Sequence, residues 1–257
     1  AIKLLDFLIE DFGFSPREIK VSFSGHRGYH VQVESEKIRE LDSTDRKEIV
    51  DYITGVGLEP AYHGLQGSPR GSIVISGPQM DEAGWRGRIA RGTHEFLLYA
   101  AREDLEELNL KKKAIEEILS RRDEILRSWE KRGPWSLIRG VGVETWKKII
   151  KRAVESQSAR IDTVVTTDVH RLIRLPNTLH GKTGWLKVSF PAEEIEKFDP
   201  LSSAIAFKKG EATIYVRKAP KFRIGEETFG PFENEKVELP MAAAMFLLCK
   251  DAAEVLD

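Results

Sequence analysis

Residues 162–184 have the sequence Asp162-Thr-Val-Val-Thr-Thr-Asp168-Val-His-Arg-Leu-Ile-Arg174-Leu-Pro-Asn-Thr-Leu-His180-Gly-Lys182-Thr-Gly184. Charged side chains are seldom placed among apolar neighbours without partners, so this mixture predicts a partly buried charged site. We expect a strand over residues 161–166. A helix is expected to begin at Thr167-Asp168 and to end before Pro176, so that Arg171 and Arg174 share one face.

The two carboxylates of this stretch favour different interpretations. Asp168 favours a structural role, in which it caps the predicted helix and pairs with Arg171. Asp162 is a carboxylate in a predicted strand beside cationic groups, and it favours a role such as holding a metal ion.

A second stretch, Ser24-Gly-His-Arg-Gly-Tyr-His30, separates two alternating segments, residues 19–24 and 29–33, which are typical of strands joined by a tight turn. A glycine-rich turn lets the backbone approach a phosphate group, and arginine supplies a fork of donors for its oxygens. The alternative for this stretch taken alone is a β-hairpin with solvated polar residues.

The rest of the chain predicts an α/β (α+β) fold with a helical insertion. Helical spacing of apolar residues indicates helices at residues 1–12 and 44–54, and charged, helix-favouring residues dominate from 80 to 156. Residues 55–79 form a connector with one short apolar piece, 72–76. Further strands are expected at 186–190 and 213–217, with a short helix at 192–198. Residues 1–79 and 157–257 would then form one domain and residues 80–156 a helical subdomain.

The composition excludes several classes of protein. The 257 residues contain 40 Lys plus Arg and 41 Asp plus Glu, so any nucleic-acid surface must be local. The single cysteine, Cys249, is expected to be a buried structural thiol. The longest apolar run, Leu239 to Cys249, is too short to span a membrane, which takes about 20 residues. No secretory signal opens the chain, and we expect a cytoplasmic protein.

Together the two motifs resemble the small, catalytic subunit of archaeal and eukaryotic DNA primases. The resemblance is carried by Ser24-Gly-x-Arg-Gly-x-His30, Asp162, Arg174 and His180-x-Lys-Thr-Gly184. It implies a primase-type mixed sheet flanked by helices, and it makes Asp162 a catalytic, metal-binding carboxylate. It also implies that the triphosphate of a nucleotide contacts six residues: Ser24, Arg27, His30, Arg174, His180 and Lys182. We assign no contact to His26.

The resemblance also implies an activity and its partners. The family makes short RNA or DNA primers from nucleoside triphosphates on a single-stranded DNA template, in a heterodimer with a large regulatory subunit. Its chemistry uses two Mg²⁺ or Mn²⁺ ions held by an Asp-x-Asp pair and a third aspartate. No Asp-x-Asp occurs in these 257 residues, and one cysteine cannot build the family's structural Zn²⁺ knob. We expect both features upstream of Ala1, and we expect this chain alone to be inactive.

Two other functions stay open from the sequence. One is a related primase-polymerase for repair or plasmid replication. The other is a non-catalytic nucleotide-binding or assembly module, if no Asp-x-Asp lies upstream.

The remaining motifs favour structural roles. Lys111–Lys113 and Arg121-Arg122 lie among glutamates and favour a solvated helix face. The tryptophans at helical spacing favour the core, and residues 184–188 favour scaffold.

Overall fold

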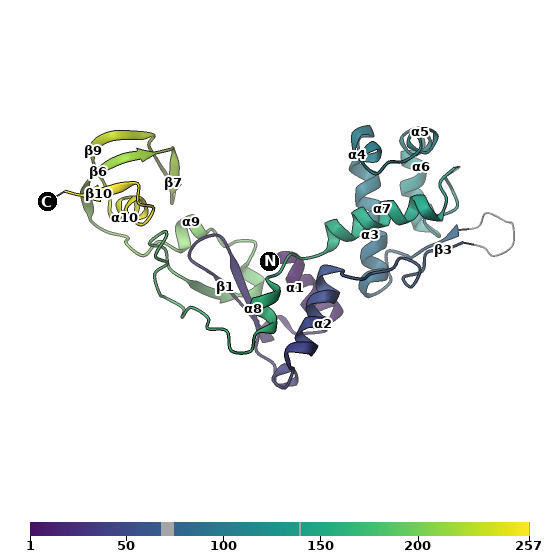
Figure 1. The fold of residues 1–257 in the computed structure, drawn as a ribbon, viewed down its shortest axis with the longest axis horizontal. Coiled ribbons are helices and arrows are strands. Elements are labelled where there is room, and N and C mark those ends of the chain that lie inside the picture. The colour runs from purple at the N-terminus through teal and green to yellow at the C-terminus, as the bar shows by residue number, and fades with distance from the viewer. Residues whose placement is uncertain (68–74, 139, 257) are drawn as a thin grey trace. The chain divides into compact units, whose positions relative to one another are not determined.

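The structure is a computed structural model that describes residues 1–67, 75–138 and 140–256, drawn in Figure 1. It has the α+β architecture that the sequence predicts, and every strand pair in it is antiparallel. The chain divides into two compact units: unit 1 comprises residues 1–5, 14–40 and 170–257, and unit 2 comprises residues 6–13 and 41–169. The functional division predicted from the sequence stays a prediction, because compactness does not assign activity.

A three-stranded sheet in unit 1 carries the first predicted motif. Its strands are β1 (Ile19–Phe23), β2 (Tyr29–Val33) and β5 (Val188–Pro191), in the order β2-β1-β5. Because side chains alternate between the two faces of a sheet, its register separates two kinds of residue. Val21, Phe23 and Phe190 share the buried apolar face, where Phe190 stacks on Phe198 with ring centroids 4.2 Å apart. The opposite face is polar.

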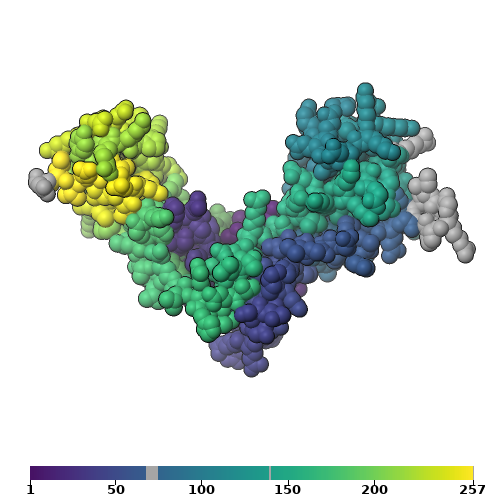
Figure 2. Space-filling view, viewed as in Figure 1, coloured from purple at the N-terminus to yellow at the C-terminus, as the bar shows by residue number. Residues whose placement is uncertain are grey.

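The rest of unit 1 is a second sheet covered by a helix. The sheet consists of β10 (Ala253–Val255), β6 (Glu211–Ala219) and β9 (Phe232–Pro240), in that order, and residues of β6 and of helix α10 (Met241–Cys249) share one apolar core. In Figure 2 these C-terminal residues form one continuous mass at the yellow end of the colour range. The other elements of this part are α9 (Pro200–Ser203), β7 (Phe222–Ile224) and β8 (Glu227–Phe229).

Two predictions for this part need correction. The helix expected at residues 192–198 is reduced to one 3₁₀ turn, η5 (Ala192–Glu194). Cys249 is free but only partly buried, because it stands on the last turn of α10, beyond the buried Ala243, Ala244 and Leu247.

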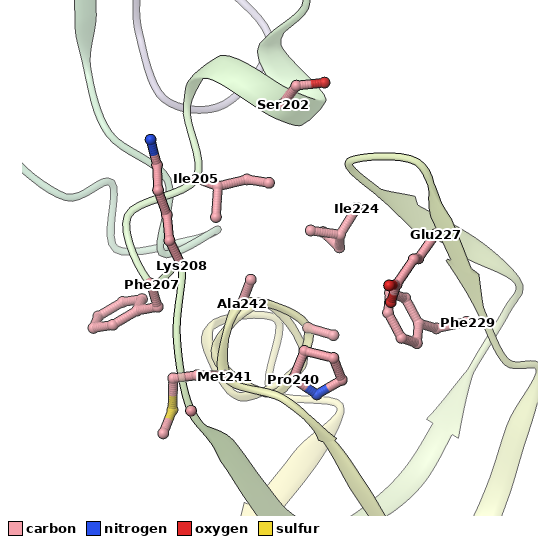
Figure 3. Close-up of a pocket in the computed structure, with 12 residues that line it drawn as sticks. Ser202, Ile205, Phe207, Lys208, Ile224, Glu227, Phe229, Pro240, Met241 and Ala242 are labelled. Atoms are coloured by element: carbon pink, nitrogen blue, oxygen red, sulfur yellow. The ribbon is translucent and has the colours of Figure 1, made fainter.

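A cavity of about 390 Å³ lies between α9, the β7–β8 hairpin and α10, and Figure 3 shows Lys208 and Glu227 on opposite sides of it.

Unit 2 confirms the helices that the sequence predicts between residues 80 and 156. The longest two, α3 (Gly84–Tyr99) and α7 (Val143–Gln157), pack together, and Gly92 permits this because a Cβ there would lie 3.2 Å from that of Ala153. Four tryptophans are buried as expected: Trp85, Trp129, Trp135 and Trp146. The other elements of unit 2 are η1 (Phe7–Asp11), α2 (Ser43–Thr54), β3 (Gln66–Gly67), β4 (Ile75–Ser76), α4 (Arg102–Glu107), α5 (Lys112–Ser120), α6 (Arg122–Arg127), η4 (Ser128–Glu130) and α8 (Thr163–Thr167).

Three further short helices lie within the first 40 residues. Helix α1 (Ile2–Asp6) runs into η1 and, with it, confirms the predicted N-terminal helix, which ends at Gly13 with φ +72°. The 3₁₀ turns η2 (Pro16–Glu18) and η3 (Glu36–Ile38) flank the β1–β2 pair. Of the apolar piece predicted at 72–76, residues 72–74 lie outside the described residues, and 75–76 form β4.

The prediction for residues 161–176 is wrong in two respects. The expected strand is instead the short helix α8, whose N-cap is Asp162. Its carboxylate accepts a hydrogen bond from the Val165 N–H at 3.1 Å, and the Thr166 hydroxyl donates back to the Asp162 carbonyl at 2.9 Å. These local bonds outweigh the strand propensity of the Val and Thr side chains. The expected helix after Thr167 does not form: Asp168 follows α8 instead of capping a helix, and Arg171 and Arg174 lie on irregular backbone.

Within the described ranges, no helix has the length and apolar character needed to cross a bilayer.

Candidate functional site

The polar face of the β2-β1-β5 sheet carries a row of hydrogen-bonding side chains. Ser22 pairs with His30 on one side and with Ser189 on the other, so all three side chains point to the same face. Ser22 is fully buried, and its hydroxyl lies 2.8 Å from that of Ser189. Lys187 is two residues before Ser189, lies on the same face and is only 1% exposed. The sheet therefore buries polar groups on one face, which is unusual unless they serve a site.

The turn from Ser24 to Gly28 lies at the end of this polar face. The Ser24 N–H donates to the Gly28 carbonyl at 2.8 Å, and the Ser24 hydroxyl accepts from the Gly28 N–H at 3.2 Å. Gly25 has φ +85°, a conformation that a residue with a side chain rarely adopts. The serine thus closes the turn that presents Arg27, while its hydroxyl proton stays available for a second partner.

A second turn, His180 to Gly184, packs directly on the first. The Thr183 hydroxyl donates to the Gly25 carbonyl, and a Cβ at Gly25 would lie 2.8 Å from the Cβ of His180. The Gly184 N–H donates to the His180 carbonyl at 2.8 Å, which closes the turn. Two segments more than 150 residues apart in the sequence are therefore held in contact by a hydrogen bond from a side chain to the main chain.

His180 has a defined hydrogen-bonding state in this turn. Its Nδ1 accepts a hydrogen bond from the Lys182 N–H at 3.1 Å. A neutral imidazole with an accepting Nδ1 carries its proton on Nε2, so His180 presents an N–H donor. Its ring lies 5.2 Å from the ring of His26, between centroids, and Nε2 of His26 lies 3.5 Å from Nζ of Lys250.

Burial and neighbouring cations lower the pKa of three histidines in this cluster. Burial is the largest cause for His26, for His30 and for His180. The charged neighbours that add to this effect are cations or another histidine of the cluster: Arg27, Arg174, Lys182, Lys187, Lys250 and His26. Among the described residues, none of these arginines and lysines forms an ion pair with a carboxylate. Such a concentration of positive charge fits a polyanionic ligand.

The structure places the predicted site residues in two groups. Six lie in unit 1, on the two turns, on β2 and on the irregular segment before His180: Ser24, Arg27, His30, Arg174, His180 and Lys182. Asp162 belongs to unit 2, where it caps α8. Among the described residues, no group of three His, Cys, Asp or Glu side chains could hold a metal ion. One aspartate does not make a two-metal centre.

Sequence reasoning missed two cations of this cluster. Lys187 was predicted to be scaffold. A lysine between Leu186 and Val188 in an alternating segment is unusual, and this was a signal in the sequence for a functional role. Lys250 gave no signal, because it reaches His26 from the end of α10, 224 residues away. Helix α10 is fixed against the second turn: a Cβ at Gly184 would lie 3.5 Å from Sγ of Cys249.

The fold brings a cluster of cations and histidines together at the contact between two glycine-containing turns. Comparison with known proteins shows which family the chain belongs to. The family described as "DNA primase small subunit" matches residues 1–192. The DNA primase small subunit PriS of Methanococcoides burtonii is 35% identical over an alignment of 271 positions, gaps included, which covers 99% of this chain and 68% of that protein. The PriS proteins of Methanothrix thermoacetophila and Natronomonas pharaonis are each 34% identical, over 99% and 88% of this chain and 69% and 60% of theirs. The chain belongs to the DNA primase small-subunit family.

Proposed function

We propose that this chain is the nucleotide-binding part of a primase catalytic subunit, which makes short RNA or DNA primers on a single-stranded DNA template. The observation that carries this proposal is the cluster of cations and histidines at the contact between the two turns, which no carboxylate among the described residues neutralises by an ion pair. In a member of this family, the natural polyanion for such a cluster is the triphosphate of an incoming nucleotide. The name of the family implies a larger partner subunit.

Each of the six residues would have a definable part in binding. Arg27 and Arg174 offer guanidinium forks, which match phosphate oxygens with two parallel hydrogen bonds. Lys182 would act as a mobile point charge. His30 and His180 would donate N–H groups, and the Ser24 hydroxyl would donate its proton. Since these contacts are made to phosphates and not to the base, the choice of nucleotide would be left to the template.

The chemical step rests on the family resemblance. Attack of a primer 3′ hydroxyl on the α-phosphate needs divalent cations that bring the two groups together and neutralise the leaving pyrophosphate. Asp162 would supply one carboxylate for Mg²⁺ or Mn²⁺, and the other carboxylates would come from outside these 257 residues. A structural Zn²⁺ is expected only in that same outside part.

The binding role of the first turn can be tested with Arg27→Ala. The loss of one charge-assisted contact typically costs about 1.5–3 kcal/mol, so we expect at least a tenfold loss of affinity for a nucleoside triphosphate. The measurement is calorimetric titration of the chain with the nucleotide and Mn²⁺. Arg39→Ala is the control, because Arg39 is exposed and pairs with the exposed Glu36 at 3.6 Å, outside the two turns. Equal affinity in the two variants would show that the first turn does not bind the triphosphate.

Binding should also depend on pH. Because the pKa values of His30 and His180 are lowered, both imidazoles are neutral in the free chain at pH 7.5. A bound polyanion favours the imidazolium and raises these pKa values, so binding takes up protons. We expect the affinity to rise several fold as the pH falls from about 7.5 to about 6, the range above and below the ordinary histidine pKa. Titration in buffers with different ionisation enthalpies measures the uptake, and His180→Gln should reduce it; equal uptake would remove His180 from the site.

The related primase-polymerases remain the nearest rival, and nothing specific favours them. They share the expected phosphate contacts, so affinity for the triphosphate does not separate the two. The preference for ribonucleotides or deoxyribonucleotides during extension by the full-length protein does, together with the identity of the partner subunit. A module without catalysis would bind nucleotide and incorporate neither.

A further inference from the structure

Lys187 is a buried cation for which the described residues provide no carboxylate partner. It is 1% exposed, and its ammonium donates one hydrogen bond, to the Arg174 carbonyl at 2.6 Å. A lysine has three donors, and burying its charge costs free energy unless an anion compensates. Burial lowers the pKa of Lys187, and Arg174 lowers it further. In the described part of the chain, no carboxylate forms an ion pair with it.

The main chain around Lys187 ties it to the segment that carries Arg174. The Lys187 N–H donates to the Thr178 carbonyl at 2.9 Å, and the Asn177 N–H donates to the Lys187 carbonyl at 2.8 Å. The Arg174 guanidinium donates to the Leu179 carbonyl at 3.0 Å. The exposed segment 174–179 is therefore held at both ends, and Lys187 makes the bond that fixes the Arg174 end.

Lys187 also faces the same side of the sheet as His30. The cross-strand row of His30, Ser22 and Ser189 lies on one face, and Lys187 precedes Ser189 by two residues. Burial is the largest cause of the lowered pKa of His30, and the charge of Lys187 is the next largest. Lys187 thus brings a positive charge to the polar face that bears His30 and to the segment that bears Arg174.

We propose that Lys187 is a positioning residue for the phosphates of the nucleotide: it fixes the Arg174 segment and supplies a desolvated positive charge that the bound triphosphate compensates. This rests on the proposed function, since it takes the same cluster as the triphosphate site. A buried ammonium that served only as scaffold would be replaceable by an apolar side chain of similar length without loss of binding.

The test is Lys187→Met, which keeps the length and bulk of the side chain and removes its charge. We expect the affinity for ATP with Mn²⁺ to fall about tenfold, as for the loss of one charge-assisted contact, whereas the affinity for adenosine changes little. Lys197→Met is the matched control, because Lys197 is exposed and lies in unit 1. In Lys187→Met, the pKa of His30 should also rise toward its ordinary value, which nuclear magnetic resonance can measure.

The outcomes separate this proposal from the one it rests on. If Arg27→Ala weakens ATP binding and Lys187→Met does not, Lys187 is scaffold and only the positioning role fails. If neither variant weakens binding, the triphosphate site itself is wrong. Should Lys187→Met fail to fold, the wild-type chain decides: its Lys187 ammonium, followed through the ε-methylene resonance, should show a rise in pKa when ATP is added. No rise on saturation would overturn the proposal.

Discussion

Replacing Asp11 by asparagine is expected to lower the free energy of unfolding of unit 2 by about 3–5 kcal/mol, the cost of breaking a buried ion pair by removing one charge. The Asp11 and Arg88 side chains are 4% and 5% exposed, and two hydrogen bonds of 2.9 and 3.0 Å join them. The Tyr52 hydroxyl donates to the same carboxylate at 3.0 Å. An asparagine can accept at only one oxygen, and its amide would face guanidinium donors.

The surroundings of this ion pair explain the size of the effect. The Arg88 guanidinium carbon lies 3.7 Å from the centre of the Phe7 ring, and burial together with the Asp11 hydrogen bond raises the pKa of Tyr52 to about 12. Asp11 thus joins η1 to α2 and α3 through one carboxylate. Unfolding in urea can be followed by tryptophan fluorescence, because four of the five tryptophans lie in unit 2.

Glu10→Gln provides the control for Asp11→Asn. Glu10 is 59% exposed and lies 3.6 Å from the same guanidinium, so its loss should cost less than about 1 kcal/mol, as for exposed pairs. If Asp11→Asn costs no more than Glu10→Gln, the buried pair does not hold η1 to the helices.

The elements that the sequence predicts well are those with strong local patterns. Strands β1 and β2 alternate over five residues each, with glycines between them. Helix α2 begins one residue before the predicted start, because Asp42 accepts hydrogen bonds from the N–H groups of Thr44 and Asp45 and so caps it. Gly55, with φ +69°, ends it. Periodicity and caps are local properties, so no tertiary information was needed.

The errors fall where local side-chain bonds or long-range contacts decide. Residues 163–167 contain only Thr and Val, which favour strands, yet Asp162 and the threonine hydroxyls satisfy the backbone of a helix. The same misassignment made Asp162 a strand carboxylate. Lys187 and Lys250 could not be found by motif, because their positions depend on cross-strand register and on the packing of α10. The six nucleotide contacts stay predictions, although all six lie in one compact unit.

Gly25→Ala is expected to remove most of the nucleotide affinity while leaving unit 2 folded. An alanine at φ +85° adopts a left-handed conformation that costs about 1–2 kcal/mol. Its Cβ would also lie 2.8 Å from the Cβ of His180 and 3.0 Å from the Trp185 carbonyl oxygen, an overpacking that costs about 1–3 kcal/mol. The two turns must then separate. With a total of about 3 kcal/mol, the affinity for ATP with Mn²⁺ should fall about a hundredfold in calorimetric titration.

The matched control is Gly28→Ala in the same turn. Gly28 has no positive φ, and among the described residues a Cβ there would meet only the Ser24 hydroxyl oxygen at 3.6 Å, an ordinary contact. Gly28→Ala should therefore bind ATP nearly as the wild type does. In Gly25→Ala, separation of the turns also breaks the hydrogen bond from the Thr183 hydroxyl to the residue 25 carbonyl, so the turn that bears His180 is no longer held against the turn that bears Arg27. Equal ATP affinity in the two alanine variants would mean that contact between the turns is not required, and that the cation cluster is not assembled for a triphosphate.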